Sequence, residues 1–324
     1  MPRLIWRTDV HMGDRTPRRR TGSWSEDVAK KLKWIGKKAK ELNADVVLDG
    51  GDFFDVKSPT KNSHSLVRLS CEAHSEYPCP VHVLVGNHDV KYGNIEYLPE
   101  QPLGVMFSSG VFQQFGDEDE IILEGDGVKV RVVGIPYHGV EYDFDRLTNL
   151  TKKDEDYLLV ACHLLARRGK TGSMFEGEDI IGYDFLNNIP QVDGWFFGHW
   201  HKDQGITKLK NGSTVVNVGS LTRGSLHLDD LDRKPCIVEV SASEESGLVF
   251  TRHNVPVRSA KNAFKIDEAV RETEDSDRML EIVEKMKNVA TENWDGLNLT
   301  DKVREMSLPN EVKEQVIFYL ENTL

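Results

Sequence analysis

The chain has 324 residues, of which 29% are charged and 39% hydrophobic, and its formal net charge is -12. This composition is typical of a globular protein, and no apolar run approaches the roughly 20 residues that a membrane-spanning helix requires. Because residues 4–6 are too short for the apolar core of a signal peptide, we expect a cytoplasmic protein without a membrane segment.

The first third of the chain alternates between strands and helices. Residues 4–8 predict a strand that opens into DVHMG, and a helix is expected over 25–42, capped by Ser25. ADVVL (44–48) predicts a second strand, which opens into GGDFFD, and a second helix is expected over 62–74. VHVLV (81–85) then leads into GNHD. This rhythm is typical of α/β layering.

The middle of the chain is richer in predicted strands. VKVRVVGI (128–135) indicates a second sheet, YLLVAC (157–162) leads into His163, and GWFFG (194–198) leads into His199 and His201. Asn211-Gly212 is a strong turn signal and predicts a hairpin. CIVEV (236–240) and LVFTRH (248–253) predict two more strands, so residues from about 204 to 258 form a mostly β segment.

Charge is distributed unevenly along the chain. Residues 3–40 contain 12 Lys or Arg against 4 Asp or Glu, whereas residues 267–324 contain 7 against 15. The net acidity argues against simple nucleic-acid binding, but the asymmetry predicts a basic face near the first motif and an acidic tail. In the tail, apolar residues at helical spacing predict two amphipathic helices, over about 276–290 and 307–320.

Metal-ligand residue types follow the predicted strands in five short motifs. The residues are Asp9, His11, Asp52, Asn87, His88, His163, His199 and His201. Strand ends in α/β sheets meet at one edge, so we expect these side chains to converge there. In an extended segment, alternation would point Asp9 and His11 to the same side. Mixed imidazole and carboxylate ligands suit a pair of manganese, iron or zinc ions.

In this order, DVH, GGDFFD, GNHD, the lone His163 and GHWH resemble the signature blocks of the calcineurin-like metallophosphoesterase superfamily. The resemblance implies an α/β four-layer fold, in which two packed β-sheets are flanked by helices. NVGSLTRGS, KPCIVEV and VPVRS further resemble SbcD-type DNA repair and recombination nucleases. On this basis we expect a nuclease domain over 1–203, a β-rich DNA-binding or capping domain over 204–262 and a helical region over 263–324.

The resemblance also implies roles for single residues. One metal would be held by Asp9, His11, Asp52 and His201, and a second by Asp52, Asn87, His163 and His199. His88 would protonate the leaving oxygen or stabilise the transition state, and Asp89 would orient His88 through a hydrogen bond. Asp55, where many relatives carry histidine, is expected to have a supporting role only.

These expectations favour a manganese-dependent DNA nuclease with exonuclease and endonuclease activity. The resemblance implies that it is the nuclease subunit of a complex with an SMC-like ABC ATPase, bound through the C-terminal helices, and that residues 62–74 form a homodimer interface. Candidate contacts to the DNA backbone are Arg18, Arg19, Arg20, Arg167, Arg168 and Arg223. Two alternatives remain: a small-molecule phosphodiesterase acting on cyclic nucleotides, and a catalytically silent scaffold, against which the intact ligand set argues.

Overall fold

The computed structural model describes residues 1–117, 119–174, 177–225, 233–266, 268, 271, 303–304, 313–314 and 317. The chain divides into two compact units, Met1–Phe264 and Lys265–Leu324. Apart from residues 313, 314 and 317, both predicted tail helices lie outside the described residues. Within the described residues, no helix is long and apolar enough to cross a membrane.

The first sheet has six strands in the order β15-β14-β1-β2-β3-β4. Their bounds are β1 Arg3–Arg7, β2 Val46–Asp49, β3 Val81–Val83, β4 Gln113–Gln114, β14 Cys236–Ser243 and β15 Gly247–Asn254. The strands from β1 to β4 run parallel to one another, and β14 joins the edge of β1 in antiparallel fashion. The carboxyl ends of β1, β2 and β3 therefore lie at one edge, as the first three motifs require.

The second sheet also has six strands, in the order β12-β13-β11-β7-β6-β5. Their bounds are β5 Glu120–Gly125, β6 Val128–Ile135, β7 Tyr157–Cys162, β11 Gly194–Phe197, β12 Gly205–Lys208 and β13 Thr214–Asn217. A small third sheet pairs β8 Ala166–Arg167, β10 Asp179–Gly182 and β9 Gly172–Ser173. The predicted hairpin at Asn211-Gly212 is confirmed, because β12 pairs with β13 across it.

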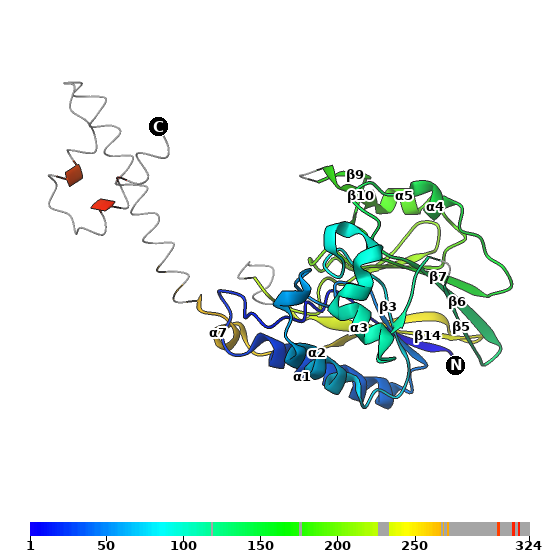
Figure 1. The fold of residues 1–324 in the computed structure, drawn as a ribbon. Coiled ribbons are helices and arrows are strands. Elements are labelled where there is room, and N and C mark those ends of the chain that lie inside the picture. The colour runs from blue at the N-terminus through cyan, green and yellow to red at the C-terminus, as the bar shows by residue number, and fades with distance from the viewer. Residues whose placement is uncertain are drawn as a thin grey trace, which may run out of the picture. The chain divides into compact units, whose positions relative to one another are not determined.

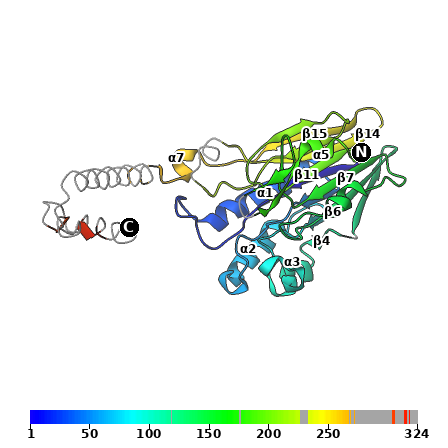
Figure 2. The same ribbon diagram turned by 90° about the horizontal axis from the view of Figure 1, so that it is seen from above.

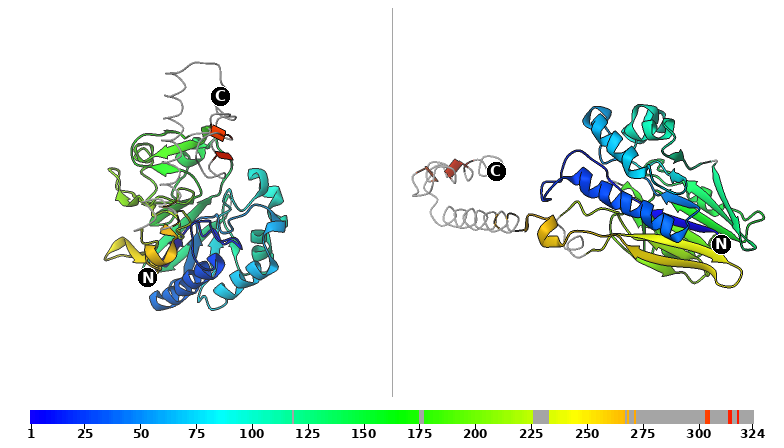
Figure 3. Two further views of the ribbon diagram at one scale, coloured as in Figure 1. Left: turned by 90° about the vertical axis from the view of Figure 1, so that its left-hand side faces the viewer. Right: turned by 90° about the horizontal axis from the view of Figure 1, so that it is seen from below.

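All but the last of the described helices pack on the outer faces of the two large sheets (Figure 1). Their bounds are α1 Trp24–Leu42, α2 His64–His74, α3 Pro102–Ser108, α4 Phe144–Thr148, α5 Tyr183–Leu186 and α7 Ala260–Ala263, with 3-10 turns at Pro59–Lys61, Lys91–Gly93 and Ile95–Glu100. In Figure 2, α2 and α3 lie on one side of the sheets, and β14 and β15, which pair with each other, lie on the other. The right-hand view of Figure 3 shows α1, in blue, lying along the strands.

Alternation along the strands explains the layers. Ile5 of β1 faces the core beneath α1–α3, whereas Leu4 and Trp6 face the core between the two sheets. In β7, Leu159 faces the same intersheet core, and Leu158 faces the third core beneath α4 and α5. Successive side chains point to opposite faces, so a strand buried on both sides reads as a continuous apolar run. The predicted four-layer fold is confirmed.

Residues 204–262 were expected to form a small domain of their own, and the structure places their strands elsewhere. β13 pairs in parallel with β11, and β14 pairs with β1, so this segment completes the edges of both large sheets. It belongs to the same compact unit as the first two hundred residues. The apolar strands at 214–217 and 236–240 have both faces buried in this way.

Helix starts differ slightly from expectation. The cap of α1 is Ser23 rather than Ser25, since the Ser23 hydroxyl accepts a hydrogen bond from the amide of Glu26. α2 begins at His64 and is capped by Ser63, which accepts from Leu66. Asp14 in turn binds the Ser63 amide and hydroxyl at 2.7 and 2.8 Å. This contact ties the loop after the first motif to the start of α2.

A buried ion pair lies beneath the loops that end β1 and β2. Arg7 Nε donates to Asp49 Oδ2 at 2.6 Å, with both side chains fully buried. Arg7 also contacts Tyr77 and His74 at 2.9 Å. Burial raises the pKa of the Asp49 carboxyl, and Arg7 opposes that rise.

Replacing Arg7 with methionine should destabilise the protein by about 3–5 kcal/mol, because it leaves the Asp49 carboxylate buried without its cation. Urea unfolding measures the change. The control is Lys153→Ala in the solvent-exposed Lys153–Glu120 pair, for which we expect less than about 1 kcal/mol. Equal losses in the two variants would contradict the prediction.

Candidate metal centre

The motif residues sit in strained loops directly after the strands. Asp9 (φ 53°), His11 (φ 49°), Asp52 (φ 53°) and His199 (φ 79°) all have left-handed backbone conformations, although none is glycine. Such conformations cost free energy outside glycine and persist where the surrounding structure demands them. The expected extended alternation of Asp9 and His11 is therefore wrong, since β1 ends at Arg7. The two side chains nevertheless meet.

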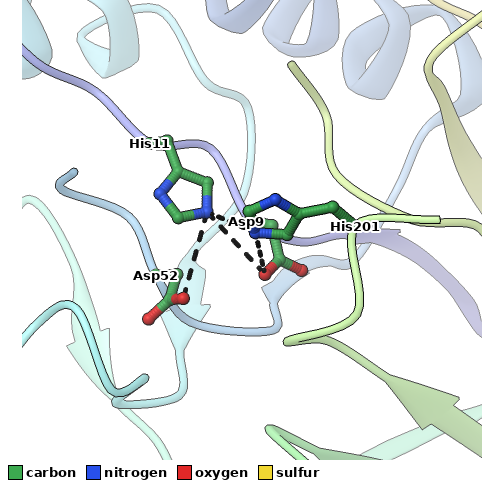
Figure 4. Close-up of side chains that lie close together, drawn as sticks. All are labelled: Asp9, His11, Asp52 and His201. Atoms are coloured by element: carbon green, nitrogen blue, oxygen red, sulfur yellow. Dashed lines mark hydrogen bonds and ion pairs between the residues drawn. The ribbon is translucent and has the colours of Figure 1, made fainter. Parts of the chain in front are cut away.

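Four of the predicted ligands form a first cluster, drawn in Figure 4: Asp9, His11, Asp52 and His201, each with a ligand atom within 4.8 Å of the others. The Nε2 atoms of His11 and His201 lie 2.8 Å apart. His11 Nε2 lies 4.0 Å from Asp9 and 3.9 Å from Asp52, and His201 Nε2 lies 3.6 Å from Asp9. Burial lowers the pKa of His201 to about 4, which keeps its nitrogen free to act as a ligand.

A second cluster adjoins the first and shares Asp52 with it. It contains His163 and His199, again with ligand atoms within 4.8 Å. His163 is fully buried, and its Nδ1 lies 2.6 Å from the carbonyl oxygen of Gly50. A proton on Nδ1 donated to that oxygen leaves Nε2 facing Asp52 at 3.4 Å and Asn87 at 3.2 Å. The Asn87 side chain thus lies where a further oxygen ligand is expected.

Close packing holds this second cluster together. A Cβ added to Gly86 would lie 2.2 Å from Asp52 Oδ1 and 2.8 Å from the His163 ring. No side chain fits there, so glycine before Asn87 is a steric requirement of the site. The GN pair of the third motif therefore has a physical basis that the sequence pattern alone does not reveal.

The electrostatics of the two clusters favour cations. Burial raises the pKa of Asp52, but His163, His11 and His88 outweigh burial and hold that pKa well below its usual range. Burial lowers the pKa of His163, but the Asp52 carboxylate outweighs it and raises that pKa to about 9. A buried carboxylate that stays ionised and draws a proton onto its neighbour marks a strongly negative site. The shared carboxylate and mixed donor set fit a pair of divalent cations.

His88 lies beside the first cluster, half-buried, with its ring 5.0 Å from that of His11. Its main-chain amide donates to Asp52 Oδ1 at 2.7 Å, and its Nδ1 lies 2.8 Å from the main-chain oxygen of Asp55. The Asp55 carboxylate lies 3.3 Å from His11 Nδ1. The main chain of Asp55 thus orients His88, and its side chain supports His11.

Asp89 was expected to form a hydrogen bond with His88, but its carboxylate has other partners. Its carboxylate accepts main-chain hydrogen bonds from Asp52 at 2.8 Å, Gly86 at 2.9 Å and Phe54 at 3.2 Å, rather than contacting the His88 ring. Burial and the Asp52 charge raise its pKa to about 7. The expected orientation of His88 by Asp89 is therefore wrong. Asp89 instead clamps the second and third ligand loops together, because its two oxygens face main-chain amides of both.

The six candidate arginines fall into different environments. Arg18 is exposed, Arg19 is half-buried, and Arg20 is buried. Arg223 is also buried, at 3% exposure, so neither it nor Arg20 lies on an open surface. Arg167 and Arg168 contact the main-chain oxygens of Lys170 and Gln204 at 3.3 and 2.7 Å, which braces the loop after His163. The structure therefore does not gather these side chains into one exposed face.

Glu178 is a site residue that the sequence patterns missed. Its Oε1 lies 2.9 Å from His199 Nε2 and accepts a hydrogen bond of 2.9 Å from the Tyr142 hydroxyl. Tyr142 in turn accepts the main-chain amide of Leu165 at 2.9 Å. This chain of contacts leaves Nδ1 of His199 as its ligand atom. The sequence analysis predicted no strand or motif at Glu178, so only tertiary contact identifies it.

Replacing Glu178 with glutamine should weaken metal binding at the second cluster by about 10–100-fold, because a carboxylate that orients a ligand histidine also raises its basicity. Competitive metal titration of the metal-free protein measures this affinity. Glu141→Gln, an exposed residue of the neighbouring loop, is the matched control and should leave the affinity unchanged. If the Glu178 variant titrates like the control, the proposed orientation of His199 is wrong.

Comparison with known proteins gives distant relatives. A "DNA double-strand break repair protein Mre11" from Archaeoglobus fulgidus is 24% identical over 235 residues, covering 67% of this chain and 49% of the relative. The protein of the same name from Methanosarcina acetivorans is 22% identical over 264 residues, covering 79% of this chain and 39% of the relative. This chain thus spans less than half the length of either relative.

A solved structure has a similar fold. It is a candidate 5′-nucleotidase from Staphylococcus aureus in complex with alpha-ketoglutarate, with a TM-score of 0.53, 17% identity, and coverage of 85% of this chain and 58% of the other. The model of the family described as "Calcineurin-like phosphoesterase" matches residues 3–203, which contain all seven predicted metal ligands. The chain belongs to the calcineurin-like phosphoesterase family.

Proposed function

We propose that this phosphoesterase hydrolyses phosphodiester bonds in DNA, as an exonuclease with endonuclease capacity of the SbcD type. Two divalent cations would be held by the two clusters, and manganese suits their mixture of imidazole and carboxylate ligands. The main support for phosphodiester hydrolysis is that Asp52 belongs to both ligand clusters and that His88 lies beside it. The choice of DNA is supported by the distant similarity to Mre11 proteins.

Divalent cations at such a site would polarise phosphoryl oxygens and lower the pKa of water. Three residues of the chain would support this chemistry. His88, with Nδ1 against the Asp55 carbonyl, presents Nε2 to substrate and in its protonated form donates to the leaving oxygen. Glu178 orients His199, and Asp89 holds the loops of Asp52 and Asn87 together.

The decisive experiment compares substrates in the presence of manganese or magnesium. End-labelled linear duplex and hairpin DNA are incubated beside cyclic nucleotides at equal concentration. We expect shortening of the linear DNA and opening of the hairpin, with little cyclic nucleotide turnover. Cyclic nucleotide hydrolysis without DNA cleavage would replace the nuclease proposal with the small-molecule phosphodiesterase, and no turnover of either would favour the silent scaffold.

We further propose that the C-terminal region binds an SMC-like ABC ATPase and that residues 62–74 contribute to a homodimer. The helix α2 at His64–His74 has an exposed outer face, which is compatible with such an interface. Deleting residues after about 270 should abolish ATPase binding but spare hydrolysis of a small diester. Retained ATPase binding would contradict the role of the tail, and a monomeric full-length protein in sedimentation analysis would contradict the dimer.

A further inference from the structure

A cavity lies apart from the two ligand clusters, between α1 and residues 256–258, with a volume of about 370 Å³. Five cationic side chains line it, with a single carboxylate among the described lining residues, that of Asp27. The cations are Arg20, Lys30, Lys31, Arg223 and Arg258. They come from four separate segments, so this concentration of positive charge exists only in the folded chain.

Most of this charge is buried. Lys31 is 7% exposed and Arg20 is 5% exposed. Arg20 donates to Asp27 at 2.9 Å and packs over the rings of Trp24 and Phe264, and Arg258 donates to the same Asp27 carboxylate. One carboxylate thus serves two guanidinium groups. Burying cations is unfavourable unless each one finds a compensating partner, and here the single anion is already shared.

Within the described parts of the chain, three donors on Lys31, Arg20 and Arg258 in the cavity wall have fewer acceptors than they can use. An ammonium group has three N–H donors, but among the described residues Lys31 Nζ has one acceptor, the Leu221 carbonyl oxygen at 3.2 Å. The Nε atoms of Arg20 and Arg258 are buried and have no hydrogen-bond partner within the described parts of the chain. Burial and the charges of Arg20 and Arg223 lower the pKa of Lys31 to about 7. Among the described residues, those that surround Lys31, Arg20 and Arg258 therefore supply less negative charge and fewer acceptor oxygens than these three side chains can use.

A phosphate group supplies what the cavity lacks. It carries up to two negative charges and several acceptor oxygens, and guanidinium groups bind it well. A carboxylate offers one charge and two oxygens. The volume exceeds that of a simple ion, and the half-buried ring of Trp34, with Pro256 and Val257, forms an apolar part of the wall. An aromatic face beside a phosphate site suits a nucleobase.

We propose that this cavity is a binding site for the phosphate group of a phosphorylated ligand, with Lys31, Arg20 and Arg258 as its donors. It is distinct from the metal centre but adjoins its main chain. Leu221, the acceptor for Lys31, donates its amide to the carbonyl of Thr8 at 3.0 Å, and Trp24 donates to the carbonyl of His11 at 2.8 Å. A free phosphate, a mononucleotide and a nucleic-acid strand share this chemistry.

The test uses the full-length, metal-free protein with a chelator present, so that phosphate cannot bind through a metal and the result does not depend on nuclease activity. Inorganic phosphate, pyrophosphate, adenosine monophosphate and a short single-stranded oligonucleotide are titrated by calorimetry, with succinate as a dicarboxylate comparison. We expect binding of at least one phosphate compound and none of succinate. The compound bound most tightly identifies the source of the phosphate.

Lys31→Met removes the central donor while keeping an unbranched apolar stem, and Lys33→Met, exposed on the same helix, is the matched control. We expect the Lys31 variant to lose about tenfold or more in affinity and the Lys33 variant to bind like the parent. Lys31→Gln provides a second variant should methionine disturb folding, which circular dichroism monitors. Absence of phosphate binding by the parent protein, or equal affinity of the Lys31 and Lys33 variants, would overturn the proposal.

Discussion

Replacing Asp52 with asparagine should remove diester hydrolysis and weaken metal binding at both clusters together. Asp52 is the residue that the two clusters share, and its carboxylate raises the pKa of His163 to about 9. Metal ions typically stabilise a charged transition state by several kcal/mol. If the variant loses about 4 kcal/mol of this stabilisation, its rate falls about a thousandfold. Metal titration and hydrolysis of an activated diester measure the two effects.

Asparagine preserves the shape of the side chain and one oxygen, which can still accept the 2.7 Å hydrogen bond from the His88 amide. The fold should therefore survive, as circular dichroism would show. Asp119→Asn, an exposed change elsewhere in the same unit, serves as the control and should bind metal like the parent. Two metal ions bound with parental affinity in the Asp52 variant would rule out the bridging role.

The second large effect is expected for His88→Gln. Loss of a general acid lowers the rate by about 10²–10⁴-fold. Metal affinity at the two clusters that share Asp52 should change little, because His88 belongs to neither of them and groups instead with His11 and Asp55. Glutamine retains an amide that can face the Asp55 carbonyl in place of Nδ1. Steady-state rates and metal titration, measured on the same preparation, separate the two effects.

A comparison of two leaving groups tests whether His88 supplies a proton. An alkoxide leaving group needs a proton, whereas a nitrophenolate does not, so the His88 variant should lose most of its rate on DNA and little on bis(4-nitrophenyl) phosphate. An equal loss on both substrates would show that His88 positions substrate or stabilises charge instead of supplying a proton. That result would leave the metal centre intact and remove only the acid role.

Local sequence determined much of the architecture. Five of the apolar runs were followed by ligand-type residues, so the strand ends and the gathering of Asp9, His11, Asp52, His163 and His201 could be predicted from short segments, whereas the four layers were expected only from the family resemblance. The reason is that strand periodicity and the meeting of parallel strand ends at one edge are properties of short segments.

The tertiary structure decided how side chains from different segments meet. Asp89 follows His88 directly, yet its carboxylate reaches the main chain of Asp52, because the turn points it away from its neighbour. Glu178 reaches His199 across a loop that carries no pattern. Such contacts depend on where loops cross in space, which neighbouring residues do not specify.

The charged residues show most clearly what the sequence determines and what the tertiary structure determines. The sequence determined that the N-terminal region is basic, which led us to expect Arg20 among the contacts to the DNA backbone, and Arg223 was a further candidate because of its place in SLTRGS. The fold buries both around one cavity with Lys31, where Asp27 and the rings of Trp24 and Phe264 contact Arg20, and the Phe264 ring also contacts Arg223. A count of charged residues gives the sign of a region's electrostatic potential. What those charges can bind depends on their burial and pairing, and only the three-dimensional packing determines these.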